Sequence, residues 1–404
     1  MRSAGLLLVG TIALPLFSGC RSDKGDRSGD SAAPPFVFRT LDLRQQDMGG
    51  RPTWRLTSPE ARYDLRRQVA QAERPEGTIY AAGKPSYRLQ AASGTVLNDG
   101  EVVLLEGGIR VEQLGARPLL IRALRARWLT RQNLLEIDRY PEVSEAYSLL
   151  RARRASFRFD QDQLQLRGEP RLLRWEQRID PLRQQRREQP ETVMVAREVD
   201  WSPRRGRLQA RGPVQAARRV PGRPASQPLQ SLIAASLDGD TRREIYWLRG
   251  PVQWQDPVER SRLQAGDVRL DLAQRTADST LPFLGMRGDL QASGEGFRVE
   301  ESQQRVSIPI GCRLLQRGDA LRADSCSWNW STQQVEAKGA VELRRQAQQQ
   351  LTRGSRLVGR LGPQGALTLT NPGGRVISRL VVPRRAAAPP PPPRQRRAPE
   401  PIRL

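Results

Sequence analysis

An alanine followed sixteen positions later by a glycine recurs five times along this chain. The pairs are Ala91 and Gly107, Ala152 and Gly168, Ala196 and Gly212, Ala234 and Gly250, and Ala323 and Gly339. A strand-like segment, a turn and a second strand-like segment separate the two residues of each pair. A unit that recurs with a constant internal spacing is the signature of a repeat protein. Weaker copies lie at residues 123–141, 265–284 and 354–376, and we interpret the five glycines as structural bends.

The first unit, residues 87–111, shows the pattern most clearly. Its apolar residues recur with a period of two, as expected when a strand presents one face to a core; they are Leu89, Ala91, Val102 and Leu104. The tripeptide Asn98-Asp99-Gly100 supplies residues that accept positive φ, which a tight hairpin turn requires. The glycine pair Gly107-Gly108 predicts a bend in the second strand.

The rest of the chain favours the same kind of structure. No long stretch has helical periodicity, and residues 61–73 are better explained as two strands joined by a loop than as a helix. A hydrophobic content of 37% is low for a compact globule, but it suits strands that alternate between an inner and an outer face. The sequence therefore predicts an all-β protein of repeated antiparallel hairpins.

Changes in composition divide the chain into six segments. Residues 1–20 have a short basic start, an apolar run too short to span a bilayer, and a lipobox-like end at Cys20, so we predict an export signal with lipidation at Cys20. An uncleaved signal anchor is the alternative, and either arrangement tethers the exported chain to a membrane. The other segments are a flexible tether at 21–35, a β region at 36–217, a Pro-rich loop at 218–230, a second β region at 231–382 and a disordered tail rich in Pro and Arg at 383–404.

The chain is strongly basic, with a net charge of +24 carried almost entirely by arginine. A GC-rich genome produces the same bias, so the excess has two explanations. Aromatic residues make up only 5% of the chain, too few for the stacking platforms of a single-strand binder. We therefore expect no nucleic-acid partner, and an anionic glycolipid or membrane surface suits the charge better.

Two cysteines remain beyond Cys20. Cys312 and Cys326 lie at equal distances from a predicted turn at Gly318-Asp319, so a hairpin would place them opposite each other. A disulfide between them fits an exported protein. The alternative is a pair of buried thiols that act as small apolar side chains.

Catalytic signatures are missing from the sequence. The chain has no histidine, which excludes Ser-His-Asp and Cys-His pairs and the usual zinc sites, and no phosphate-binding glycine loop is present. Carboxylate pairs such as Asp160 with Asp162 and Glu300 with Glu301 fall at predicted turns, where we expect them to be solvated. We predict no enzyme activity, no cofactor and no metal. A hydrolase that uses only carboxylates would need two of them converging about 5 to 9.5 Å apart.

The strand-rich start at residues 36–64 and the repeated units resemble the LptC family of periplasmic lipopolysaccharide-export proteins. The units themselves are similar to the OstA-like repeats shared by LptA, LptC and LptD, and the resemblance spans residues 36–382. It implies an extended open β-jelly roll, made of two antiparallel sheets that hold lipid acyl chains between them. The chain is about twice as long as ordinary members, as in long lipoprotein-like relatives from cyanobacteria.

The resemblance also implies a site, partners and a location. The implied lipid-groove residues are Leu89, Val102, Leu104, Phe157, Phe159, Leu164, Leu166, Val199, Trp201 and Leu208. The implied partners are lipopolysaccharide, an inner-membrane ABC transporter and an LptA-like or LptD-like jelly roll joined by edge-strand pairing. The protein would be periplasmic and tethered to the membrane by its N-terminus. Two alternatives for these residues and this function are an ordinary sandwich core and a structural or glycan-binding surface β-protein.

Overall fold

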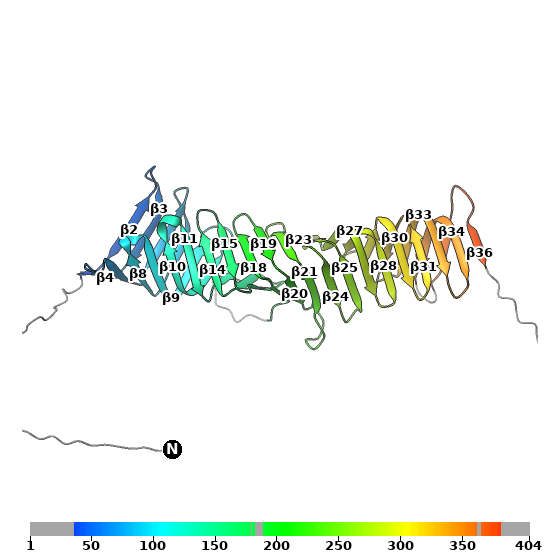
Figure 1. Ribbon diagram of the computed structural model, residues 1–404, viewed down its shortest axis with the longest axis horizontal. Coiled ribbons are helices and arrows are strands. Elements are labelled where there is room, and N and C mark those ends of the chain that lie inside the picture. Colours follow the sequence, from blue (N-terminus) through cyan, green and yellow to red (C-terminus); the bar gives the residue numbers. More distant parts are fainter. Residues whose placement is uncertain (1–35, 179, 182–188, 362–364, 381–404) are drawn as a thin grey trace, which may run out of the picture. The chain divides into compact units, whose positions relative to one another are not determined.

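The computed structural model describes residues 36–178, 180–181, 189–361 and 365–380 (Figure 1). The segments 1–20, 21–35 and 383–404 and the predicted lipidation site at Cys20 lie outside the described residues. The described residues all belong to one compact unit by their contacts. The described residues form 36 strands and two single-turn 3-10 helices, η1 (Asn98–Gly100) and η2 (Thr130–Gln132). This confirms the all-β prediction.

All strand pairs are antiparallel, and their hydrogen bonds define two sheets that meet along one line. Sheet I contains β1 (Phe36–Phe38), β4 (Glu60–Asp64), β5 (Val69–Glu73), β8 (Ser93–Leu97), β11 (Leu134–Arg139), β14 (Arg154–Arg158), β15 (Gln163–Arg167), β18 (Glu198–Ser202), β19 (Arg207–Arg211), β22 (Ser236–Asp240), β23 (Ile245–Arg249), β26 (Val268–Asp271), β29 (Arg305–Ile308), β32 (Ser325–Asn329) and β35 (Leu367–Thr370). Sheet II contains β2 (Leu41–Gln46), β3 (Pro52–Ser58), β6 (Glu76–Ala81), β7 (Lys84–Gln90), β12 (Glu142–Ser144), β13 (Ser148–Arg151), β16 (Arg171–Arg174), β17 (Thr192–Val195), β20 (Val214–Arg218), β21 (Gln230–Ala234), β24 (Val252–Asp256), β25 (Ser261–Ala265), β30 (Ile310–Gln316), β31 (Asp319–Ala323) and β36 (Ile377–Leu380).

Six long strands pass through both sheets and join them. They are β9 (Val102–Gln113), β10 (Leu120–Leu129), β27 (Thr276–Arg287), β28 (Leu290–Glu300), β33 (Gln334–Arg345) and β34 (Gln350–Arg360). In β9, for example, residues 102–106 pair with β8 in sheet I and residues 110–113 pair with β7 in sheet II. The glycine pair Gly107-Gly108 lies between these two stretches, where both residues have positive φ, as the predicted bend requires.

Strand pairing is local in sequence throughout the described residues. No strand pairs with one more than three places away in chain order; β15, for example, pairs with β14 and β18. The chain therefore makes one hairpin in sheet I, crosses to sheet II for the next hairpin, and crosses back. This zigzag is the structural form of the sequence repeat.

The alanine and glycine of each repeat mark the two crossings. The alanine ends a sheet II strand or follows it directly, and the glycine lies where the chain returns to sheet II. The five glycines have φ between 73° and 80°, a region that costs other residues free energy because of their Cβ. A Cβ at these glycines would also lie only 2.1 to 3.0 Å from a side-chain atom of the residue after the alanine. Glycine is therefore favoured at these five positions for two reasons: the positive φ and the close approach of a neighbouring side chain.

The structure confirms the predicted strand pair at residues 61–73 and the predicted turn at residues 98–100. Residues 61–73 lie in the hairpin of β4 and β5, not in a helix. Residues 98–100 form the turn between β8 and β9, with positive φ at all three positions. The Pro-rich loop at 218–230 joins β20 to β21, and these strands pair with each other. Strand pairing thus continues across the loop.

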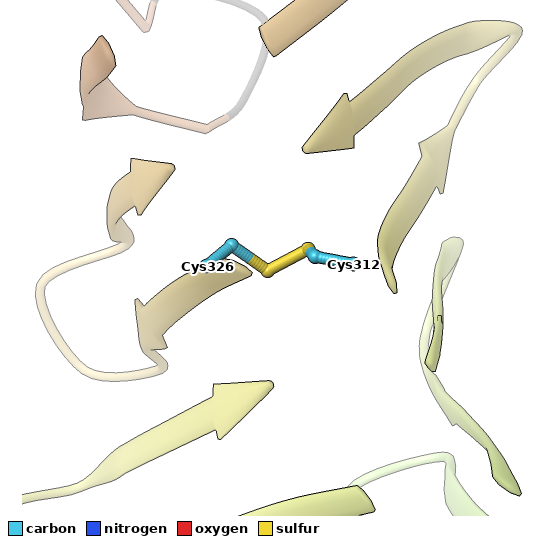
Figure 2. Close-up of a disulfide and its surroundings, with 2 residues drawn as sticks. All are labelled: Cys312 and Cys326. Carbon is cyan, nitrogen blue, oxygen red and sulfur yellow. A yellow bond between two sulfur atoms is a disulfide. The ribbon is translucent and has the colours of Figure 1, made fainter. Parts of the chain in front are cut away.

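A disulfide joins Cys312 to Cys326, with 5.8 Å between their Cα atoms (Figure 2). The predicted hairpin opposition is wrong, because Cys312 faces Ala323 across the β30–β31 hairpin. The chain crosses between sheets at Asp324, so Cys326 lies in β32, where it faces Ile308 and Ala337. The disulfide therefore connects sheet II to sheet I near the line where they meet.

Candidate functional site

The inner faces of the two sheets carry continuous rows of apolar side chains. In sheet I, successive cross-strand pairs link one row through the whole ladder. Its members are Val96, Val103, Trp128, Leu135, Phe157, Leu164, Trp201, Leu208, Gly239, Tyr246, Leu270, Ala277, Val299, Val306, Trp328 and Val335. All the row members that carry a side chain belong to the hydrophobic core or pack against it.

Sheet II carries a matching row on the face turned towards sheet I. Its members are Leu43, Leu56, Gly77, Leu89, Val111, Ile121, Val143, Leu150, Leu172, Met194, Ala216, Leu232, Trp254, Leu263, Gly285, Ala292, Leu314, Leu321 and Leu343. We call the space between the two rows the groove. It is bounded on one side by the crossings and on the other by two lines of turns, the free edges of the two sheets.

The structure places eight of the ten predicted groove residues inside. They are Leu89, Phe157, Phe159, Leu164, Leu166, Val199, Trp201 and Leu208, all buried and all in the core. Their role in holding lipid stays a prediction.

The prediction is wrong for the other two, Val102 and Leu104. Leu104 is 37% exposed and Val102 is partly exposed, whereas Val103 and Leu105 are fully buried. Residues 102–105 are four consecutive apolar residues, so alternation could not show which of them face inward. The register after η1 decides it, because Val103 pairs with the buried Val96.

In the first part of the ladder, aromatic side chains from opposite sheets fill the groove. Trp54 of sheet II meets Trp128 of sheet I edge to face, with 5.4 Å between ring centroids. Tyr87 of sheet II contacts Phe157 and Phe159 of sheet I at 5.3 and 5.2 Å. Every sheet I row member from Val96 to Leu208 is buried. We call the groove over residues 54–208 the filled portion.

Three residues lock the free edges of the filled portion together, and we call them the latch. The Tyr87 hydroxyl of sheet II donates to Asp162 Oδ1 at 3.3 Å and accepts from Arg204 Nε at 2.9 Å. Asp162 and Arg204 both lie in turns at the free edge of sheet I. Asp162 Oδ2 also accepts the backbone N–H groups of Arg204 and Arg205 at 2.8 and 3.3 Å. The Arg204 guanidinium stacks on the Tyr87 ring, 4.7 Å from its centroid.

The latch is buried as well as bonded. Asp162 is only 5% exposed and Tyr87 is fully buried. Burial raises the pKa of the Tyr87 hydroxyl, so it stays protonated and able to donate. Burial also raises the pKa of Asp162, against the effect of its hydrogen bonds with Arg204, Arg205 and Tyr87.

A second contact between the free edges follows the latch. Arg174, the last residue of β16 in sheet II, donates to Glu244 Oε1 at 2.8 Å, and Glu244 lies in the β22–β23 turn of sheet I. The Arg174 guanidinium also lies over the Tyr147 ring, 6.0 Å from its centroid. Nearby, burial raises the pKa of Tyr246 to about 12.

Beyond Glu244 the groove changes character, and we call it the open portion. The sheet I row members Tyr246, Leu270, Ala277, Val299, Val306 and Trp328 are all partly exposed. Among the residues that the structure describes, no hydrogen bond or ion pair connects the two free edges after Glu244. Opposite this row, Leu232, Trp254 and Leu263 of sheet II are partly exposed too. Apolar surface here remains accessible from the free edges.

The carboxylates singled out from the sequence are not arranged for catalysis. Asp162 is buried in the latch, so its expected solvation is wrong, and Asp160 is exposed. Glu300 accepts from Arg305 at 2.7 Å and lies 3.7 Å from Arg298. Within the described part of the chain, no group of three or more Cys, Asp or Glu residues could hold a metal ion. No helix in that part is long and apolar enough to cross a membrane.

Among the described residues, both ends of the ladder have strands that pair on one side only. At the start, β1 pairs only with β4 and β2 only with β3, and the three side chains of β1 are exposed. At the other end, β35 and β36 each pair only with β34. Ile377 and Leu380 of β36 are exposed apolar side chains. Unpaired strand edges of this kind are templates for strand addition.

Comparison with known proteins finds one family and one solved structure that are similar to parts of this chain. Residues 5–171 match the model of the LptC family, described as lipopolysaccharide-assembly, LptC-related. No protein of curated function matches the chain. Among solved structures, the chain is similar to LptH of Pseudomonas aeruginosa, described as the LptA homologous periplasmic component of the conserved lipopolysaccharide transport device. That similarity has 17% identity and a TM-score of 0.25, and it covers 28% of this chain and 82% of LptH. Residues 5–171 are thus similar to the LptC-related family of lipopolysaccharide-assembly proteins.

Proposed function

We propose that this chain is a membrane-tethered periplasmic bridge, which accepts lipopolysaccharide from an inner-membrane ABC transporter and passes it towards the outer membrane. The observation that carries the proposal is the pair of apolar rows that run without interruption along both sheets. An acyl chain between these rows would meet similar side chains at every repeat. The sugars and phosphates of the same lipid would stay at the free edges, in water.

Movement along the groove requires sites of similar affinity. Burying one methylene group contributes roughly 0.8 kcal/mol, so a single deep pocket would hold an acyl chain too tightly for it to move on. The rows instead place residues without charged side chains opposite one another from strand to strand, mostly apolar ones such as Leu164 with Trp201 and Tyr246 with Leu270. Direction would come from the transporter, which adds lipid at one end.

The unpaired end strands support the bridging part of the proposal. Strand addition at β1 or β2 would join the ladder to a transporter component, and addition at β35 or β36 would join it to an LptA-like or LptD-like jelly roll. Such a joint would extend the apolar rows from one protein into the next. The predicted tether at Cys20 would keep the first end near the membrane.

In-cell photo-crosslinking tests the proposal. A photoreactive phenylalanine analogue replaces the inward residues Leu105, Leu164 and Trp328 one at a time, and the outward residues Leu104, Gln165 and Trp247 serve as matched controls. We expect adducts that an antibody against lipopolysaccharide detects at one or more inward positions and at no outward position. Normal folding with no adduct at any inward position would favour a structural or glycan-binding β-protein.

A further inference from the structure

We propose that the resting acyl-chain site of this protein lies in the open portion of the groove, between Tyr246 and Trp328, and that the latch must part before lipid passes along the filled portion. The inference rests on the proposed function and adds to it the place where lipid is held. This place lies beyond residues 5–171, the part of the chain that matches the LptC family.

The two portions differ in the space between their sheets. Aromatic rings from opposite sheets are in contact in the filled portion, for instance Tyr87 and Phe157 beside the latch, and a lipid there would have to displace them. In the open portion, Phe283 and Phe297 are also in contact, with 5.0 Å between ring centroids, but they lie beside the crossings between the sheets. The open portion has small residues in the same rows. They are Ala277 in sheet I and Gly285 and Ala292 in sheet II. The larger side chains of its sheet I row, such as Tyr246, Leu270 and Trp328, are partly exposed, so an acyl chain could cover them without unpacking the core.

The two portions also differ in how easily an acyl chain can enter between the free edges. An acyl chain that enters from the side must pass between the free edges of the sheets. The latch and the Arg174–Glu244 ion pair connect these edges in the first part of the ladder. Within the described residues, no such contact is present beside the open portion. Lipid can therefore reach the groove there without breaking a buried polar network.

Positive charge on the free edges indicates which kind of lipid would bind in the open portion. Three exposed arginines lie in turns on the free edges beside the open portion: Arg242 and Arg275 on sheet I and Arg260 on sheet II. None of the three forms a salt bridge with a described residue, although acidic residues such as Glu244 and Glu259 lie in the same turns. Cations at the rim of an apolar groove complement an anionic headgroup attached to acyl chains. The occupant is accordingly an anionic lipid.

The test uses the purified full chain with purified lipopolysaccharide as the probe. The photoreactive analogue is placed at Trp328 in the open portion or at Leu164 in the filled portion, with Trp247 and Gln165 as outward controls. We expect an adduct at Trp328 at least five times more abundant than at Leu164, and none at the controls. Equal adducts at the two inward sites would overturn this inference and leave the proposed function intact. No adduct at either site would contradict both.

A variant of the latch tests whether the latch itself, and not the position of Leu164 along the groove, keeps lipid away from this residue. Tyr87→Phe combined with Arg204→Gln removes the bonds of the tyrosine hydroxyl and keeps the ring, and the backbone bonds to Asp162 remain. Adducts at Leu164 should rise several-fold in this variant, and those at Trp328 should stay within twofold. An unchanged yield at Leu164, with a circular dichroism melt like that of the parent, would show that the latch does not close the groove.

The headgroup part of the inference has its own control. Arg260→Gln with Arg275→Gln should lower the yield at Trp328 several-fold in low salt. Arg313→Gln with Arg322→Gln removes the same charge from the outer faces of β30 and β31 and should leave the yield unchanged. An equal loss in both double variants would mean that net charge, and not the rim, attracts the lipid.

Discussion

The filled and open portions of the groove share one backbone plan but differ in what lies between the sheets. Both are built from the same zigzag, and the same inward rows pass through both. In the filled portion, contacts such as Trp54 with Trp128 connect the sheets through the interior. In the open portion, the ring contact of Phe283 with Phe297 and the covalent link between Cys312 and Cys326 connect them near their junction. The inward apolar side chains of the sheet I row from Tyr246 to Trp328 stay partly exposed.

This difference teaches that the repeat determines where side chains point, whereas individual residues determine whether the space is occupied. Aromatic side chains that meet across the sheets, such as Tyr87 and Phe157, fill the groove, whereas row members such as Tyr246 and Trp328 leave part of their surface exposed. A chain of this kind can therefore combine a rigid section with a section able to receive a ligand, without any change in topology. The predictions below test this contrast.

Truncation of matched leucines should give the largest difference. Leu164 and Leu270 occupy the same row, but Leu164 is fully buried and Leu270 is partly exposed. Leu164→Ala should lower the free energy of unfolding by about 2 to 5 kcal/mol, the usual cost of a large-to-small change in a packed core. Leu270→Ala should cost less than half as much. Urea unfolding followed by circular dichroism measures both, and equal losses would remove the distinction between the portions.

Loss of the disulfide should destabilise the open portion by a comparable amount. The Cys312–Cys326 link closes a loop with a sequence separation of 14, for which the chain-entropy model gives about 3 kcal/mol. In the Cys312→Ser, Cys326→Ser variant, amide hydrogen exchange should accelerate in β30 and β32 and stay unchanged in β14 and β15. Uniform acceleration along the ladder would contradict a local effect.

Substitution of the crossing glycines should have a smaller effect that differs between the portions. Gly107 and Gly250 both have positive φ, and each faces an alanine Cβ. An added Cβ would lie 3.0 Å away at Gly107 and 2.5 Å away at Gly250. Each change to alanine should cost about 1 to 2 kcal/mol for the left-handed conformation, and Gly250→Ala should cost more because of the clash.

A control for this comparison is available in the β6–β7 turn. Gly83 has positive φ, but an added Cβ would meet no atom within 4 Å. Gly83→Ala therefore reports the cost of the conformation alone, measured in the same urea titration. If it equals the cost of Gly250→Ala, the close approach of the strands contributes nothing.

The pH dependence of the filled portion should be the smallest effect. Burial raises the pKa of Asp162, so the folded chain binds this proton more tightly than the unfolded chain does. The contribution of Asp162 to stability is then fully present below about pH 4, its unfolded pKa, and is lost as the pH rises through the raised value. Stability of the parent relative to Asp162→Asn should fall as the pH rises above about 4. A constant difference would show that the carboxyl does not titrate in this range.

The repeat could be predicted from the sequence because crossings need particular residues. A glycine at positive φ and a small residue beside it recur at fixed spacing, and the spacing reports the length of one hairpin. Inward positions were clear where apolar and polar residues alternate, as around Phe157 and Leu164. They were not clear at residues 102–105, because an unbroken apolar run fits either register.

The latch could not be predicted, because it depends on contacts distant in sequence. Tyr87 and Arg204 are 117 residues apart, and neither belongs to a recognisable motif. The sequence predicts Asp162 only as a solvated turn residue, which is the commoner role of aspartate at such a position. The open portion escaped prediction for a related reason, since Tyr246 and Trp328 have the same alternation as core residues. Only the three-dimensional packing distinguishes a side chain that is covered from one that is not.

The local pairing of strands has a consequence for how the chain acquires its structure. Every described strand pairs with a strand at most three places away in chain order. The entropy lost when a loop closes to form such a pair is therefore small at every step. Each new hairpin can add to the hairpins already formed, and folding can proceed from the first strands before the last ones are present. A chain that emerges gradually, N-terminus first, can thus assemble in the same order in which it appears.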